Sequence, residues 1–323
     1  MNGLYDLNAE NFENVALELF RHQAQHCPVY ERFIHFLGID PVQVKSLTQI
    51  PFLPISFFKT QEVVTGEWSP ITVFESSGTT GTVSSKHYIK DTSFYLAHSQ
   101  QLFEQFYGPL EAYHFLALLP SYLERGNSSL VYMVDHFIKE SKSPYSGFYL
   151  DDLSALTKVL HEAYADQRRT TVLLGVSFAL LDLVEEVQLA MPDLVVMETG
   201  GMKGRRKEMI REALHAQLTR GFGVEQIHSE YGMTELLSQA YSKGAGIFKA
   251  PPSMKVLFRD LNDPFSIDLN RSRGGVNIID LANRHSCAFI ETQDIGEAYG
   301  EDTFGIIGRF DNSDIRGCNL LLS

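Results

Sequence analysis

A run of hydroxyl and glycine side chains between residues 75 and 87 is the clearest chemical feature of the sequence. It reads Glu-Ser-Ser-Gly-Thr-Thr-Gly-Thr-Val-Ser-Ser-Lys-His, so seven of its thirteen side chains are hydroxyls. Glycine permits positive φ, and backbone N–H groups around Gly78 and Gly81 can then point into one concavity, as in anion-binding nests. The sequence therefore predicts a phosphate-binding loop, with contacts from Ser76, Ser77, Gly78, Thr79, Thr80, Gly81 and Lys86.

Two other interpretations of this loop imply different classes of protein. A flexible linker would have a similar composition, but linkers are seldom bracketed by strand-like runs such as residues 71–74 and 87–89. A Walker A loop needs a second glycine five residues after the first, followed by lysine, and neither Gly78 nor Gly81 has one. We therefore expect a turn within a sheet that binds phosphate differently from a P-loop.

A second stretch, Ser229-Glu-Tyr-Gly-Met-Thr-Glu235, follows another strand-like run. The face of Tyr231 suits a nucleobase, and Gly232 permits close approach of a ligand to the backbone. Thr234 can donate to phosphate, and Glu235 offers the hard oxygen ligand that Mg²⁺ prefers. Thr-Glu is also an ordinary start to a helix, so this stretch alone is a weak indication of a nucleotide site. Together with the phosphate-binding loop it is a strong one.

The elements that must position these residues alternate along the chain. We expect strands at 113–119, 171–176 and 194–198 and helices at 91–106, 128–139, 151–166, 177–190 and 205–219. Such alternation predicts an α/β fold with a helix-covered, mostly parallel sheet. Ligands of such sheets lie at the carboxyl ends of strands, so the corners at 120–122, 175–177, 199–201 and 229–232 are expected walls of one site.

The two ends of the chain have a different texture. Residues 11–37 read as two amphipathic helices broken at Cys27-Pro28, and short β runs at 255–258, 276–281, 288–290 and 305–310 predict a small, mostly antiparallel subdomain. We therefore divide the chain into a helical preface (1–70), an α/β nucleotide-binding core (71–249) and a β-rich subdomain (250–323).

Composition limits the classes of function. The 323 residues are 44% hydrophobic and 21% charged, as in an ordinary globular protein. A net charge of −13 argues against a nucleic-acid partner. No apolar run is long enough to span a membrane and the N-terminus lacks the layout of a signal peptide, so we expect a cytoplasmic protein. Three cysteines without CxxC spacing predict neither a disulfide framework nor a zinc site, and Cys27 and Cys287 are expected to be structural.

The order of the motifs resembles the adenylate-forming (AMP-forming) acyl ligase superfamily and its large-domain fold. Thr292-Gln-Asp294 resembles that family's Thr-Gly-Asp segment, and 308–317 resembles its Gly-Arg-x-Asp hinge segment. The resemblance implies ATP and Mg²⁺, with Thr234, Glu235 and Cys318 catalytic and Glu235 on the metal. It also implies backbone at 199–202 presented to adenine, and Asp294 and Arg309 on the ribose. The nucleotide-binding residues that it implies are Ser76, Ser77, Gly78, Thr79, Thr80, Gly81, Lys86, Gly200, Gly201, Met202, Glu230, Tyr231, Gly232, Thr234, Asp294 and Arg309.

The departures from the family favour its acyl-protein synthetase branch. The chain ends at Ser323, without the mobile lid that usually follows the hinge, and Gln293 replaces a glycine. Members of that branch activate a fatty acid and pass it to a cysteine near their C-terminus. Cys318 fits that acceptor role by position, although a packed structural cysteine fits the same place.

Several alternatives stay open. The acyl acceptor could instead be coenzyme A, as in an acyl-CoA ligase of the phenylacetate-CoA ligase type, or an acyl-carrier protein or a partner reductase. The chain could be a non-catalytic nucleotide-binding module. Finally, residues 175–179 approach the nucleophile elbow of serine hydrolases, with Ser177 as nucleophile and His215 or His228 as base.

Overall fold

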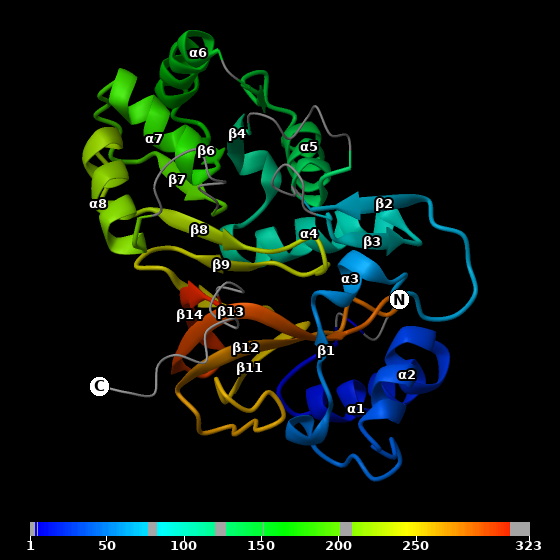
Figure 1. The fold of residues 1–323 in the computed structure, drawn as a ribbon. Coiled ribbons are helices and arrows are strands. Elements are labelled where there is room, and N and C mark those ends of the chain that lie inside the picture. Colours follow the sequence, from blue (N-terminus) through cyan, green and yellow to red (C-terminus); the bar gives the residue numbers. More distant parts are fainter. Residues whose placement is uncertain are drawn as a thin grey trace, which may run out of the picture.

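The computed structural model describes residue 4 and residues 6–76, 83–119, 127–150, 152–200 and 209–310 (Figure 1). The described helices are α1 (Phe12–His26), α2 (Pro28–Phe36), α3 (Phe57–Thr60), α4 (Thr92–Tyr107), α5 (Ser129–Ser141), α6 (Leu153–Ala165), α7 (Ser177–Glu186) and α8 (Arg211–Phe222). The described strands are β1 (Leu53–Pro54), β2 (Thr72–Glu75), β3 (Lys86–Ile89), β4 (Tyr113–Leu118), β5 (Gly147–Phe148), β6 (Thr170–Gly175), β7 (Val195–Glu198), β8 (His228–Tyr231), β9 (Ala240–Ser242), β10 (Ile247–Lys249), β11 (Met254–Arg259), β12 (Arg273–Asp280), β13 (Phe289–Gly300) and β14 (Thr303–Arg309).

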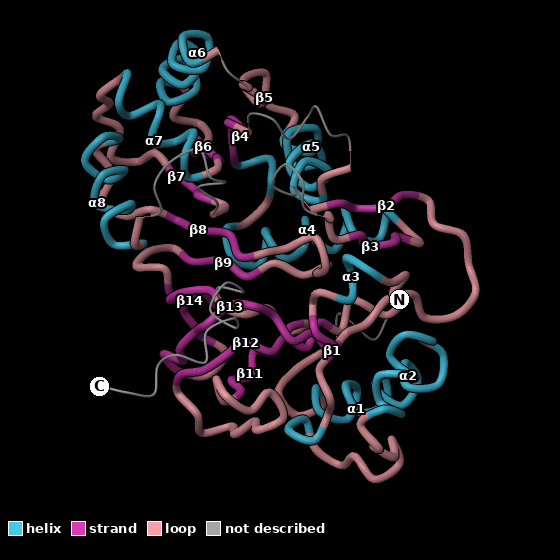
Figure 2. Tube along the Cα trace, viewed as in Figure 1, coloured by secondary structure: helices cyan, strands magenta, loops and turns pink. Residues whose placement is uncertain are grey.

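One twelve-stranded mixed sheet runs through the molecule. Its strand order is β11-β12-β13-β14-β10-β9-β8-β7-β6-β4-β5, with β1 added beside β13. Figure 2 shows the strands through the middle of the molecule, α4 to α8 around its upper part, and α1 and α2 at its lower end. The predicted helix-covered α/β fold is confirmed. Among the helices of the described ranges, none has both the length and the apolar character needed to cross a membrane.

The parallel half of the sheet carries the predicted corners. Strands β5, β4, β6, β7 and β8 pair in parallel, so their carboxyl ends share one edge. All six residues of β4 are buried, as expected for a strand covered by helices on both faces. Residues 199–200 and 232 therefore follow neighbouring strands at one edge, as the sequence predicts; the corner at 120–122 lies outside the described residues.

Two helices differ in extent from the prediction. Helix α7 ends at Glu186 instead of residue 190, because the next segment turns to bond the end of α8: the N–H groups of Leu189 and Met191 donate to the carbonyls of Gly221 and Phe222. Helix α8 begins at Arg211 because Ile210 is extended, with ψ 148°. Of the predicted start of that helix, residues 205–208 lie outside the described residues.

The antiparallel half confirms the expected β runs after residue 250. Strands β11 to β14 pair in antiparallel order. They join the parallel half through β9 and β10, which pair β8 with β14. These two short strands were not predicted. They make the sheet continuous across the molecule.

The N-terminal helices pack on the C-terminal strands. The ring of Phe289 on β13 lies 5.9 Å from that of Phe20 and 6.1 Å from that of Tyr30. Gln23, fully buried, donates to the carbonyl of Asn283 at 2.8 Å and accepts from the N–H of Ala288 at 2.9 Å. Residues 1–70 and 250–310 thus share one core.

The predicted phosphate loop joins two strands, as expected. β2 and β3 form an antiparallel hairpin in which Glu75 faces Lys86. At its base, the N–H of Ser76 donates to the carbonyl of Ser85, and the N–H of Ser85 donates to Ser76 Oγ at 2.9 Å. Residues 77–82 lie outside the described residues.

Candidate active site

A cavity of about 420 Å³ opens where the hairpin, the start of α5, the ends of β7 and β8, and the end of β14 meet. It gathers the described parts of all four sequence motifs. Its lining residues are Ile55, Lys59, Glu75, Ser76, Val83, Ser85, Tyr95, Ser128, Ser129, Leu130, Met133, Thr199, Glu230, Gly232, Met233, Thr234, Glu235, Gln239, Gln293 and Arg309.

Hydroxyl groups dominate one part of this lining. Six serine and threonine side chains contribute: Ser76, Ser85, Ser128, Ser129, Thr199 and Thr234. The N-terminus of α5 begins at Ser129, and Ser128 makes no side-chain cap to it. The first N–H groups of a helix lack intrahelical partners and favour an anion. Thr199 Oγ1 is buried with no hydrogen-bond partner among the described residues. The surplus of donors fits an anionic ligand such as phosphate.

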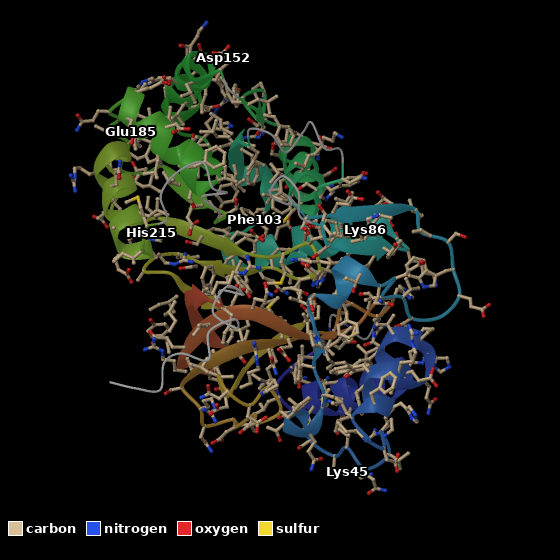
Figure 3. The ribbon with its side chains drawn as sticks, in the orientation of Figure 1. Lys45, Lys86, Phe103, Asp152, Glu185 and His215 are labelled. Atoms are coloured by element: carbon tan, nitrogen blue, oxygen red, sulfur yellow. The ribbon has the colours of Figure 1, made fainter. Side chains whose placement is uncertain are left out.

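Cationic side chains add to this character. Lys59 on α3 and Arg309 at the end of β14 both line the cavity. Lys59 was not predicted from the sequence; the predicted lysine, Lys86, lies on β3 of the hairpin (Figure 3), is exposed and is not among the residues that line the cavity. Side chains alternate along a strand, and the neighbouring His87 is the one that points inward, so a phosphate contact of Lys86 stays a prediction.

Glu235 offers a buried carboxylate to the cavity, with 5% of its surface exposed. Burial raises its pKa, while a hydrogen bond from Ser85 and the charges of Arg309 and Lys59 act against that rise. A cation beside Glu235 would favour its ionised form. The described residues contain no group of three or more His, Cys, Asp or Glu able to hold a metal. Mg²⁺ commonly uses one or two carboxylates plus substrate phosphates, so Glu235 fits it only together with a phosphate ligand.

Asp294 lies next to the cavity with two polar partners. Tyr231 Oη donates to Asp294 Oδ2 at 2.8 Å, and Arg309 Nε lies 3.7 Å from Asp294 Oδ1. Burial raises the pKa of Asp294, opposed by Arg309 and the tyrosine hydroxyl. The ring of Tyr231 is 8% exposed and packs on Phe248 and Phe304. Stacking of a base on this ring stays a prediction, and it needs the ring to be uncovered.

The turn that contains Thr234 and Glu235 is held by three buried side chains that the sequence analysis missed. His87 Nδ1 donates to the carbonyl of Thr234 at 2.9 Å, and burial lowers the pKa of His87 to about 4. Asn283 donates to the carbonyl of Glu235 at 2.8 Å. Asp280 accepts from the N–H groups of residues 237 and 238 at 2.8 and 2.9 Å. The hairpin and the end of β12 thus fix this turn.

Glu198 at the end of β7, also not predicted from the sequence, fixes the neighbouring corner. Its Oε1 accepts from Arg211 and Ser229, both at 2.8 Å, and its Oε2 accepts from the N–H of Gly200 at 2.7 Å. Burial raises the pKa of Glu198, but contacts with His215, Arg211, Ser229 and Gly200 outweigh burial and lower the pKa to about 2. This network holds Gly200 at the site.

The same network bears on the hydrolase alternative. Ser177 is 2% exposed and donates to Glu198 Oε2 at 3.2 Å, so a carboxylate takes the place of the histidine base that a nucleophilic serine needs. His215 contacts the other oxygen of that carboxylate, at 3.5 Å, and His228 bonds the hydroxyl of Tyr107. This arrangement does not support Ser177 as a nucleophile.

The structure therefore brings Ser76, Glu230, Gly232, Thr234, Glu235 and Arg309 to one cavity, with Gly200, Tyr231 and Asp294 beside it. Eight further predicted site residues lie outside the described residues: Ser77, Gly78, Thr79, Thr80, Gly81, Gly201, Met202 and Cys318. Cys27 and Cys287 are buried free thiols. Burial raises the pKa of both, which suits a structural role.

No protein-family model matches the chain, and no curated protein does. Among solved structures, it is similar to O-succinylbenzoate coenzyme A synthetase from Bacillus subtilis in complex with AMP, at 16% identity and a TM-score of 0.49 over 76% of this chain and 62% of that one. It is also similar to amide bond synthetase McbA from Marinactinospora thermotolerans, at 15% identity and a TM-score of 0.47 over 77% of this chain and 51% of that one. A third similar structure is a benzoate CoA ligase from Burkholderia xenovorans LB400. It has 15% sequence identity and a TM-score of 0.44 over 72% of this chain and 47% of that one.

The chain covers between 47% and 62% of the length of these three structures. Their TM-scores lie below 0.5.

Proposed function

We propose that the chain activates a carboxylic acid with ATP, giving an acyl-adenylate and pyrophosphate, and then transfers the acyl group to a thiol. One observation carries this proposal: a single cavity collects Ser76 of the hairpin loop, the Thr234–Glu235 turn and Arg309 beside Asp294. These residues come from stretches far apart in the sequence, and each has a chemistry that suits one part of ATP.

In the proposed step, a carboxylate oxygen of the acid attacks the α-phosphorus. The bond from that phosphorus to the bridging oxygen of pyrophosphate breaks, and the electron pair leaves with pyrophosphate. Negative charge grows on the phosphate oxygens, where the hydroxyls of Ser76, Ser85 and Thr234 and the N-terminus of α5 can donate. Lys59 and Arg309 offset the same charge.

Two carboxylates have separate tasks in this proposal. Asp294 accepts hydrogen bonds from the ribose hydroxyls, and Tyr231 fixes its orientation through the 2.8 Å bond. Glu235, with the phosphates, would hold Mg²⁺, which supplies further charge neutralisation when bound. Glu198, Asn283 and His87 act through the backbone that they hold, and so we assign them as positioning residues.

The finer assignments come from the resemblance to acyl-protein synthetases. It favours a fatty acid as substrate and Cys318 as the first acyl acceptor; coenzyme A, a carrier protein or a partner reductase are the other acceptors to test. With ATP and the acid, we expect a hydroxylamine-labile thioester on Cys318. Cys318→Ser should lose this label and keep pyrophosphate exchange. A label on coenzyme A with Cys318 unmodified would make the chain an acyl-CoA ligase.

The test of the activation step is exchange of labelled pyrophosphate into ATP across a panel of carboxylic acids. Thr234→Ala and Glu235→Gln should each lower the exchange rate by about a hundredfold or more, as loss of one preorganised donor or ligand commonly does. Glu225→Gln, which removes an exposed carboxylate, is the matched control and should leave the rate unchanged. ATP binding without exchange for any acid would instead indicate a non-catalytic nucleotide-binding module.

A further inference from the structure

Two polar side chains, Glu230 and Gln239, meet in the cavity beside Gly232. A Cβ added at Gly232 would lie 2.3 Å from Glu230 Oε1 and 3.5 Å from Gln239 Cγ, so both side chains crowd the same point. Both line the cavity, together with the aromatic and apolar side chains of Tyr95 and Met133. The hydroxyl of Tyr95 already donates to the carbonyl of Ser129 at 3.0 Å, so the carboxyl and the amide are the polar groups of these four side chains that a ligand can reach.

Neither polar group has its hydrogen-bonding capacity met. Gln239 is 3% exposed; its amide nitrogen donates to the carbonyl of Leu237 at 3.2 Å, and its Oε1 has no partner among the described residues. The structure gives Glu230 no hydrogen-bond or ion-pair partner within the described ranges. Buried polar groups of folded proteins are nearly always paired, so the buried and unpaired Gln239 Oε1, with the half-buried Glu230 carboxyl beside it, suits a ligand that pairs both.

The surroundings of Glu230 keep it from acting as an ordinary surface carboxylate. Burial, and then the charge of Glu198, raise its pKa to about 8. Glu198 itself is fully occupied by its contacts with Arg211, Ser229 and Gly200. Near neutral pH, Glu230 is thus mostly the protonated acid, able both to donate and to accept a hydrogen bond.

Strand geometry separates Glu230 from Tyr231 and from Asp294, the residue assigned to the ribose. Successive side chains of a strand point to opposite faces, so Glu230 leaves β8 on the face opposite to Tyr231. Tyr231 bonds Asp294, the residue assigned to the ribose. Glu230 and Gln239 bond neither of these two residues, so both can contact the other substrate.

We propose that the acid activated at this site carries a hydrogen-bond donor, a hydroxyl or an amine, on the part that lies against Glu230 and Gln239. This inference rests on the proposed function. A hydroxyl would donate to Gln239 Oε1 and accept from the Glu230 carboxyl, whereas an ammonium would donate to both. An unsubstituted alkyl chain would leave both groups unpaired, and a site of this kind rejects such an analogue.

The experiment compares acids in matched pairs by pyrophosphate exchange at saturating ATP. Each pair has the same carbon skeleton, with and without a hydroxyl or an amine. For the preferred pair, we expect kcat/KM to favour the substituted acid by roughly tenfold or more. Glu230→Leu should abolish that preference, and Glu230→Gln, which keeps a donor and an acceptor, should retain most of it. Melting temperatures of both variants check that each one folds.

The outcomes separate this inference from the proposed function. Exchange that is fastest with unsubstituted fatty acids, and equally selective in Glu230→Leu, overturns the inference and leaves the activation step standing. A Glu230 variant that changes KM for ATP and not the choice of acid would assign Glu230 to the nucleotide. Absence of exchange with every acid overturns the proposed function, and the inference with it.

Discussion

Glu198 provides the sharpest test of how the site is held together. This carboxylate is 3% exposed and accepts hydrogen bonds from Arg211, Ser229, Gly200 and Ser177. Despite burial, its partners lower its pKa from the ordinary 4.5 to about 2. Each pKa unit corresponds to about 1.4 kcal/mol, so ionised Glu198 contributes roughly 3 kcal/mol to the free energy of unfolding at pH 7.

The direction of the pH dependence follows from the sign of that shift. The pKa is lower in the folded chain, so the contribution is present above pH 4.5 and is lost as the pH falls toward 2. Glu198→Gln keeps the shape of the side chain but removes the charge that faces Arg211. We expect this variant to lose roughly 2 to 3 kcal/mol at pH 7 and only about half of that at pH 3.

Urea unfolding followed by circular dichroism at pH 7, 5 and 3 measures the difference. Glu225→Gln, at an exposed position, is the control and should stay within about 0.5 kcal/mol of the parent chain at each pH. The reasoning is refuted if Glu198→Gln unfolds at the same urea concentration as the parent at pH 7. It is refuted equally if the deficit is the same at pH 3 as at pH 7, because charge would then not be its source.

Three further predictions concern the other contacts of the site. Asp294→Ala should reduce the rise in melting temperature that ATP produces, while Tyr231→Phe, which removes only the 2.8 Å hydrogen bond, should reduce it less. Gly232→Ala should lower the exchange rate and the melting temperature, because its Cβ would lie 2.3 Å from Glu230 Oε1; Gly147→Ala, whose Cβ would meet its nearest atom at 3.8 Å, controls for lost backbone freedom. The pKa of Glu230 is raised to about 8, so its ionisation opposes folding between pH 4.5 and 8. The melting temperature of Glu230→Gln should therefore rise relative to that of the parent chain as the pH increases from 5 to 9. A melting-temperature difference that stays constant over this pH range would contradict the prediction.

Local sequence patterns were sufficient for most of the sheet and not for its continuity. The buried strands β4, β6 and β7 are apolar runs between helix-like segments, and such runs can be recognised as strands from the local sequence. Strands β9 and β10 have three residues each, too few to display a period, yet they join the parallel half to the antiparallel half. Their existence depends on pairing with β8 and β14, which a local pattern does not contain.

The candidate site shows the same division between local and distant information. Ser76, Thr234 and Glu235 stand in short motifs whose residue types suggest their chemistry, and they do line one cavity. His87 and Asn283 hold the turn of Thr234 and Glu235 from 147 and 48 residues away. A histidine and an asparagine without a motif give no local signal of that task. Lys59 was missed for the same reason.

The contact of α1 and α2 with β13 limits when these helices can pack during synthesis of the chain. Gln23 and its hydrogen-bond partner Ala288 are 265 residues apart in the sequence. The rings of Phe20 and Tyr30 pack on the ring of Phe289. A ribosome that adds 5 to 20 residues per second needs on the order of ten to fifty seconds to bridge that separation. Throughout that interval the apolar face of α1 and α2 has no partner strand, and Asn283 has not yet been made to hold the turn of Glu235. The N-terminal helices must therefore wait until Phe289 has been made, and until then their apolar face is open to chaperones or to aggregation.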